Sequence, residues 1–232
     1  MNLRSFILGL SASFGVAWLA LIVVPYFHMN QLAPIPFEES TATKGVFYPK
    51  RTGRVTDGAL VYAQNGCYNC HSQVVRPTYA GADMYRADWG GLKEDADRGD
   101  TRRETNAFDF TYENFAQIGV HRVGPDLSNL GRRVEALYAQ EISPENWLYT
   151  HLYNPTAIAG RESSHCPPHP FLFTTREVKG AKSDRALPID AGSDQEIVPT
   201  PDAKALVSYL LSLKKDHPVP PTLQFAPPEE EN

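Results

Sequence analysis

Two cysteines and a histidine stand at a spacing that indicates covalent attachment of haem. The segment Cys67-Tyr68-Asn69-Cys70-His71 matches the pattern C-x-x-C-H. Two thiols three residues apart can reach the two vinyl groups of a haem, and the imidazole that follows can bind the iron. With 3 cysteines and 7 histidines among 232 residues, a chance match is expected in about one such chain per thousand. The sequence therefore predicts one covalently bound c-type haem.

Other uses of a C-x-x-C pair lack the surroundings that they need. A zinc site requires a second pair of ligands, and a thioredoxin-like dithiol requires a βαβ unit around it. Neither context is evident in the sequence. No phosphate-binding loop, carboxylate pair or nucleophile with a base stands out either. Hydrolytic and nucleotide-dependent activities therefore have little support.

An uncharged run near the N-terminus predicts one membrane-spanning helix. Residues 6–27 are 22 positions without a charged side chain, and a helix of that length is about 33 Å long. A signal peptide would have an apolar core of about 7 to 15 residues and then a small-residue cleavage site. Neither feature is present, so we expect residues 1–29 to be an uncleaved single-pass anchor in contact with membrane lipid.

The haem decides the expected orientation of this anchor. Arg4 precedes the span, and Lys44, the nearest cation after it, is offset by Glu38 and Glu39, so the charge signal is weak. Haem c is attached outside the cytoplasm, which predicts a bacterial inner (cytoplasmic) membrane with the C-terminal haem domain on the periplasmic side. A net charge of −5 argues against a nucleic-acid-binding surface.

The remainder of the chain is predicted to hold one domain. We expect a proline-containing linker over residues 30–53, the haem domain over residues 54–216, and a disordered tail rich in proline and glutamate over residues 217–232. Two charged or polar stretches, near residues 88–106 and 176–198, are interpreted as solvated insertions.

Three helices are expected inside this domain. The first, capped by Thr56 or Asp57, runs up to the haem motif; the others open at Ser143 and at Thr200, and the last ends near Lys215. The second and third have proline at the first helical position. No strand alternation dominates and no repeat is found. The predicted fold class is all-α.

Residues beyond the C-x-x-C-H motif carry a wider similarity. The run 65–77, the loop 124–127, the helix end 151–155 and the anchor with Pro25 resemble the membrane-anchored monohaem cytochrome c subunit (subunit II) of cbb3-type haem-copper cytochrome c oxidases. The resemblance implies a class I cytochrome c-like domain that relays electrons and is not an enzyme as an isolated chain. The implied partners are the haem-copper catalytic subunit, a dihaem cytochrome c subunit and a soluble cytochrome c donor.

The resemblance also assigns roles to single residues. It implies that the carbonyl of Pro125 accepts a hydrogen bond from the second ring nitrogen of His71 and so fixes the tautomer of the iron ligand. Arg76 is a candidate partner for a haem propionate, and an ordinary surface arginine is the alternative. His121 and His151 receive no role, because an imidazole without a ligand function is the commoner case.

The sixth iron ligand is where this sequence departs from the resembled family. The family has a methionine before a proline, whereas this chain reads Cys166-Pro167. We take Cys166 as the candidate ligand, with His165, His169, Met84 or an open site as alternatives. A thiolate would lower the reduction potential relative to a thioether. Cys166 could also be a small buried side chain, or the cluster could bind adventitious zinc or copper.

Two other functions stay open at this point. An anchored haem c enzyme or sensor would use a Cys/His-ligated or open iron. The cytochrome c subunit of a nitric oxide reductase shares the anchor and the haem, but it matches the residues around Gln73 and Arg76 less well.

Overall fold

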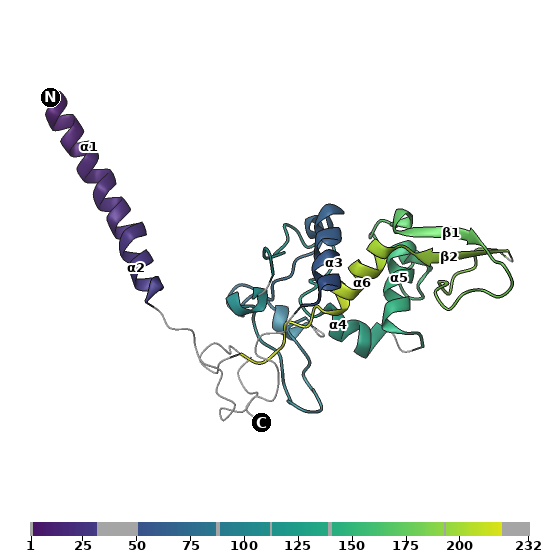
Figure 1. Ribbon diagram of the computed structural model, residues 1–232. Helices are drawn as coiled ribbons and strands as arrows, with labels where there is room; N and C mark the ends of the chain where they lie inside the picture. Colours follow the sequence, from purple (N-terminus) through teal and green to yellow (C-terminus); the bar gives the residue numbers. More distant parts are fainter. Residues whose placement is uncertain are drawn as a thin grey trace. The chain divides into compact units, whose positions relative to one another are not determined.

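The chain forms two compact units, residues 1–38 and 39–232, and each is described by itself (Figure 1). The computed structural model describes residues 2–31, 51–86, 89–111, 113–138, 141–192 and 194–219. The linker predicted over residues 30–53 and the tail predicted over residues 217–232 lie largely outside this range.

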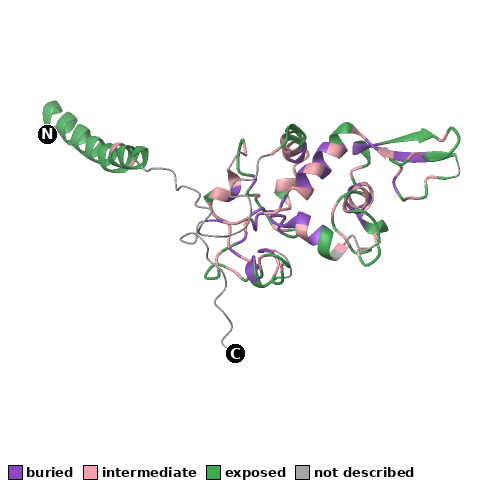
Figure 2. Ribbon diagram, turned by 60° about the horizontal axis from the view of Figure 1, so that its bottom comes forward, coloured by how far each residue is buried: buried purple, intermediate pink, exposed green. Residues whose placement is uncertain are grey.

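The first unit is a single long apolar helix. It comprises α1 (Leu3–Trp18), a π-helical turn (Leu19–Val23) and α2 (Val24–Asn30). Of these 28 residues, the most apolar stretch of 18 has a mean hydropathy of 2.3 and none of it is buried; Figure 2 shows this helix mainly in green. The π turn ends two residues before Pro25, whose ring cannot fit the regular hydrogen-bond ladder. The helix is long and apolar enough to cross a bilayer.

Two crossing helices, α3 (Gly53–Gln64) and α6 (Pro201–Leu211), form the framework of the second unit. The rings of Tyr62 and Tyr209 lie 5.5 Å apart between them. The expected cap of α3 at Thr56 or Asp57 is wrong, because the hydroxyl of Thr52 accepts the hydrogen bond of the first turn and the helix starts at Gly53. The haem motif follows α3 directly, so this crossing also fixes its starting point.

Gly58 makes the crossing of α3 and α6 possible. A Cβ atom there would lie 2.0 Å from the carbonyl oxygen of Ala205 and 2.7 Å from the Cβ of Tyr209. We expect Gly58→Ala to lower the free energy of unfolding by about 1–3 kcal/mol through overpacking, measured by denaturant unfolding of the detergent-solubilised chain. Gly53→Ala, where nothing lies within 4 Å, is the control. Equal stability of the two variants would contradict a tight crossing.

The remaining helices pack around this framework. They are α4 (Leu130–Arg133), which continues as a π-helical turn (Val134–Tyr138), and α5 (Pro144–Tyr153). The caps expected for α5 and α6 are confirmed: Ser143 and Thr200 accept hydrogen bonds from the backbone of the first turn. Short 3-10 turns complete the fold at Cys67–Asn69, Asp83–Tyr85, Ala107–Phe110, Pro155–Ala157 and Pro170–Leu172.

The fold is mostly helical, which confirms the predicted class, and an antiparallel hairpin accompanies the helices. β1 (Phe173–Glu177) pairs with β2 (Gln195–Pro199), with Thr175 opposite Ile197. Phe173 and Ile197 are buried in the main core. The predicted polar insertion near residues 176–198 therefore begins and ends in strands, and β-branched residues at its margins favour that conformation.

The charged stretch near residues 88–106 is also less solvated than predicted. Arg103 is buried and pairs with Asp109 at 2.5 Å. Arg98 donates to the carbonyl oxygen of Asp216 at 2.8 Å, and the hydroxyl of Thr101 donates to the Asp216 carboxylate at 2.9 Å. These contacts hold the segment against the chain that follows α6. A count of charges along the sequence cannot show such pairing.

Candidate haem site

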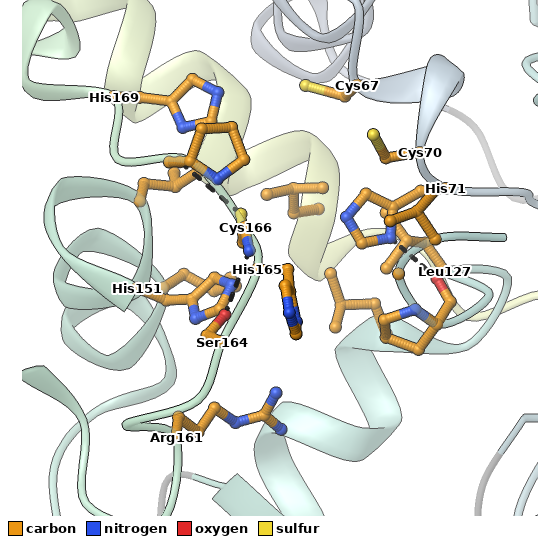
Figure 3. Close-up of a pocket in the computed structure, with 18 of the residues that line it drawn as sticks. Cys67, Cys70, His71, Leu127, His151, Arg161, Ser164, His165, Cys166 and His169 are labelled. Carbon is orange, nitrogen blue, oxygen red and sulfur yellow. Dashed lines mark hydrogen bonds between the residues drawn. The ribbon is translucent and has the colours of Figure 1, made fainter. Parts of the chain in front are cut away.

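A cavity of about 440 Å³ lies beside the C-x-x-C-H motif. Its size is in the range typical of cofactor pockets. One wall carries the motif and the opposite wall carries the segment after α5, as Figure 3 shows. The cysteines and histidines on these two walls are Cys67, Cys70 and His71 on the first and His151, His165, Cys166 and His169 on the second.

The local backbone explains why the two cysteines share a wall. Gly66 ends α3 with a left-handed φ of 66°, which favours glycine. The chain then forms a 3-10 turn in which the amide of Cys70 donates to the carbonyl of Cys67 at 3.2 Å. Residues three apart eclipse one another in such a turn. Both side chains therefore line the cavity.

His71 is held in the tautomer that an iron ligand needs. Its Nδ1 lies 2.8 Å from the carbonyl oxygen of Pro125, which can only accept, so Nδ1 carries the proton and Nε2 keeps its lone pair. Burial lowers the pKa of His71, against the opposing hydrogen bond to Pro125, and favours the neutral ring. Gly124 lies against the ring: a Cβ there would be 2.2 Å from Cε1.

The loop that carries Pro125 is fixed to the haem motif by Asp126. This buried carboxylate accepts hydrogen bonds from the Ser72 hydroxyl at 2.6 Å, the Val74 amide at 2.8 Å and the Ser128 amide at 2.8 Å. A carboxylate with several donors is a strong anchor in a buried site. The position of the Pro125 carbonyl is thus set by contacts on both sides of it.

Arg76 lies outside the cavity, so its placement does not match the expected contact with a propionate. Its Nε and Nη2 donate to the carboxylate of Asp83 at 3.1 and 2.9 Å. Arg122 donates to the same carboxylate at 2.8 Å. Asp83 is fully buried, and a buried carboxylate attracts the nearest guanidinium groups.

The two arginines determine the protonation of Asp83. Burial raises the pKa of this carboxyl, but the hydrogen bonds from Arg76 and Arg122 outweigh burial and hold the pKa well below its ordinary value. A carboxyl group with a lowered pKa stabilises the fold at pH values above its pKa in the unfolded chain. That contribution is lost as the pH falls through its pKa in the folded chain.

Asp83→Asn is therefore expected to do two things. It should lower the free energy of unfolding at neutral pH by about 1–3 kcal/mol, because the exposed Arg76 and the partly buried Arg122 lose charge-assisted hydrogen bonds to a buried carboxylate. It should also flatten the decline in stability between about pH 5 and pH 3. Denaturant unfolding at several pH values measures both, with the exposed Asp97→Asn as control. An unchanged acid decline would contradict the assignment.

The wall facing His71 carries three of the four candidates for the sixth ligand. Cys166, His165 and His169 line the cavity, whereas Met84 is buried elsewhere, against Gly90. The amide of His169 donates to the carbonyl of Leu152 at 2.8 Å, which fixes this segment to α5. Burial raises the pKa of the Cys166 thiol, and Cys70 contributes in the same direction.

Within the described residues, no group of three or more His, Cys, Asp or Glu side chains is arranged to hold a metal ion. The cluster around Cys166 therefore lacks the ligand set of a zinc or copper site.

His151 lines this cavity, although no role is predicted for it from the sequence. Its ring stacks on Trp147, with centroids 5.2 Å apart and planes within 6°. Burial first, and then the nearby Arg161, lower the pKa of His151 to about 4, so the ring is neutral at pH 7. The spacing of four residues on a predicted helix could have indicated that Trp147 and His151 share a face.

Two arginines also reach the cavity. Arg133 is 2% exposed and donates to the carbonyl of Asp126, and the guanidinium of Arg161 lies 4.5 Å from the centre of the Tyr138 ring. No local sequence pattern distinguishes them from other arginines of the chain. They supply positive charge to a cavity that is otherwise mainly apolar.

The residues present fit haem c. Two thiols and a neutral, oriented imidazole stand on one wall, apolar side chains fill most of the lining, and two arginines offer partners for carboxylates. A Cβ at Gly124 would overlap the ring of His71, so glycine at this position is what leaves space for the ring in this orientation.

Comparison with known protein families agrees with this chemistry. The sequence model of the FixO family, described as the mono-haem subunit of cytochrome c oxidase, matches residues 11–191. The matched range runs from the apolar helix through the haem motif and the Cys166 segment into the loop between β1 and β2. No curated protein matched the chain.

Proposed function

We propose that this chain relays electrons to the haem-copper subunit of a cbb3-type oxidase, because it belongs to the FixO family of mono-haem subunits of cytochrome c oxidase. The chain is the electron-transfer component of the oxidase, and oxygen is reduced in another subunit. Bound haem c supplies an iron that alternates between the ferric and ferrous states. The observation that carries the proposal is the oriented His71 beside two cavity-lining cysteines.

Each residue of the motif wall has a defined task in this proposal. Cys67 and Cys70 hold the haem by thioether bonds, and His71 binds iron through Nε2 while Pro125 fixes its ring. Arg133 and Arg161 would bind the propionates in place of Arg76, because these two guanidinium groups line the cavity.

We also propose Cys166 as the sixth ligand, with His165 and His169 as the remaining alternatives. Support comes from its place on the wall opposite His71 and from its place in the sequence before Pro167. A thiolate would give this haem a lower reduction potential than thioether ligation. Electrons could still pass downhill to a haem-copper centre.

The other oxidase subunits are its partners. The finer expectations stay proposals: a dihaem cytochrome c subunit beside this chain, a soluble cytochrome c as donor, and a bacterial inner membrane with the haem domain on the periplasmic side. They rest on the apolar helix and on the site of haem attachment.

Purification of the tagged full chain from detergent-solubilised native membranes tests the proposal. We expect one haem c per chain, a haem-copper subunit in the same preparation, and oxidation of the haem when oxygen is admitted. The ferrous chain freed of its partners should not bind carbon monoxide, because His71 and a side chain of the opposite wall would both hold the iron. Full occupancy with haem but no haem-copper subunit would contradict the proposal, and carbon monoxide binding would favour the haem enzyme or sensor.

A further inference from the structure

His151 is a cavity-lining histidine that neither attaches haem nor belongs to the segment of the candidate sixth ligands. It comes from α5, and Figure 3 shows it on the wall opposite His71. Its ring is stacked on Trp147, with centroids 5.2 Å apart and planes within 6°. This stacking fixes the plane of the imidazole, so its two nitrogens point in defined directions.

The two ring nitrogens of His151 have different surroundings. Nδ1 is enclosed by protein atoms and has no hydrogen-bond partner among the described residues. The ring nevertheless borders the cavity. Because Nδ1 is enclosed, the edge that carries Nε2 is the one that can meet a group inside the cavity.

The enclosure of Nδ1 also decides where the proton of the neutral ring lies. A buried N–H group without an acceptor is rare in proteins, and a buried acceptor without a donor is less so. Leaving a buried donor unpaired costs about 1–3 kcal/mol. The proton therefore belongs on Nε2, and His151 presents one N–H donor to the cavity.

This arrangement is the reverse of the one at His71. The Nδ1 of His71 donates to the carbonyl oxygen of Pro125 at 2.8 Å, which leaves Nε2 free to bind iron. A histidine that binds a metal almost always donates its other ring N–H to a partner. His151 has no such partner at Nδ1. Its surroundings therefore suit a hydrogen-bond donor and not an iron ligand.

Arg161 indicates which acceptor meets this donor. The guanidinium carbon of Arg161 lies 5.3 Å from the centre of the Trp147 ring, the same ring on which His151 is stacked. Both side chains line the cavity. A haem carries two propionate carboxylates, and these are the groups that a guanidinium binds. A propionate held by Arg161 would therefore come near the Nε2 edge of His151.

We propose that His151 binds a haem propionate through its Nε2–H group, beside Arg161, and thereby raises the reduction potential of the haem. The inference rests on the proposed function, since it requires haem c attached in this cavity. Negative charge near the iron stabilises the ferric state. A hydrogen bond disperses the charge of the carboxylate, so it favours the ferrous state by comparison.

Two substitutions at position 151 separate hydrogen bonding from packing. His151→Phe keeps an aromatic ring against Trp147 and removes the donor, whereas His151→Gln removes the ring and keeps an N–H donor. In potentiometric titration of the full detergent-solubilised chain, His151→Phe should shift the ratio of ferrous to ferric haem at a fixed potential at least about threefold toward ferric, which is about 28 mV for one electron. His151→Gln should stay within about 1.5-fold of the wild type.

The propionate bending vibration in the resonance Raman spectrum gives a second readout. Loss of the hydrogen bond should shift this vibration in His151→Phe and leave it in place in His151→Gln. His121→Phe is the matched control, because His121 is exposed and does not line the cavity, and it should change neither readout. Nitrogen-15 NMR of the histidine-labelled ferrous wild type needs no substitution, and it should show His151 with its proton on Nε2.

The outcomes separate this role from packing and from iron ligation. Equal shifts in His151→Phe and His151→Gln, or no shift in His151→Phe, would overturn the inference, because the ring would then only pack. A proton on Nδ1 would overturn it too, as would loss of the low-spin signal in His151→Phe, which would make His151 an iron ligand. Failure of the proposed function looks different, because the unmodified chain would then purify with no haem-copper subunit.

Discussion

Gly124→Ala should reduce the haem c content of the chain at least tenfold. The added methyl group would lie 2.2 Å from Cε1, 2.7 Å from Nδ1 and 2.9 Å from Nε2 of His71. A ring pushed away by this methyl group loses the hydrogen bond to Pro125 and leaves the position from which Nε2 can bind iron. The backbone of Gly124 is not in the left-handed region, so the effect is steric.

The measurement is haem c per chain after expression with the attachment machinery, together with the optical and electron paramagnetic resonance spectra of the ferric protein. Residual haem protein should lack the low-spin signal of the wild type. Gly53→Ala is the matched control, since nothing lies within 4 Å of a Cβ there. If Gly124→Ala retained full haem content and a low-spin spectrum, His71 would not be the ligand placed by the Pro125 carbonyl.

Cys166→Met should raise the reduction potential by several tenths of a volt, within the roughly 0.8 V range over which axial ligands act. A thiolate donates charge to ferric iron and stabilises that state, whereas a thioether stabilises the ferrous state by comparison. Position 166 lines the cavity on the wall opposite His71. The native cysteine and the substituted methionine would therefore approach the iron from the same segment.

Potentiometric titration of the wild type and of Cys166→Met measures the shift, and electron paramagnetic resonance of Cys166→Ala identifies the ligand. A low-spin thiolate signal in the wild type should vanish in Cys166→Ala and persist in His165→Gln. If the alanine variant kept both its spectrum and its potential, the sixth position would belong to His165 or His169, and Cys166 would only line the cavity.

The helices were predictable because their signals are local. Ser143 and Thr200 are N-caps followed by proline, and the structure starts α5 and α6 at those prolines. The start of α3 was misplaced because Thr52, Thr56 and Asp57 can all cap and the sequence cannot rank them. The hairpin was missed because its strands are five residues each and are separated by a long polar loop.

The residues that attach the haem were predictable from the sequence, whereas the placement of the arginines around the site was less so. Cys67, Cys70 and His71 follow from one contiguous pattern. The placement of Arg76 could not be foreseen, because Asp83 lies seven residues away along an irregular segment and folds back onto it. Arg133 and Arg161 are far apart in sequence and meet the cavity only in the folded chain.

The haem motif, the apolar helix and the family can be recognised from the sequence alone, since each depends on residues that are adjacent or regularly spaced in the chain. The folded chain is needed to establish which carbonyl orients His71, which side chains face it across the cavity, and that Arg98 and Arg103 are paired with carboxylates. These properties depend on distances between segments remote in sequence, and such distances are set by the packing of α3, α5 and α6 around one core.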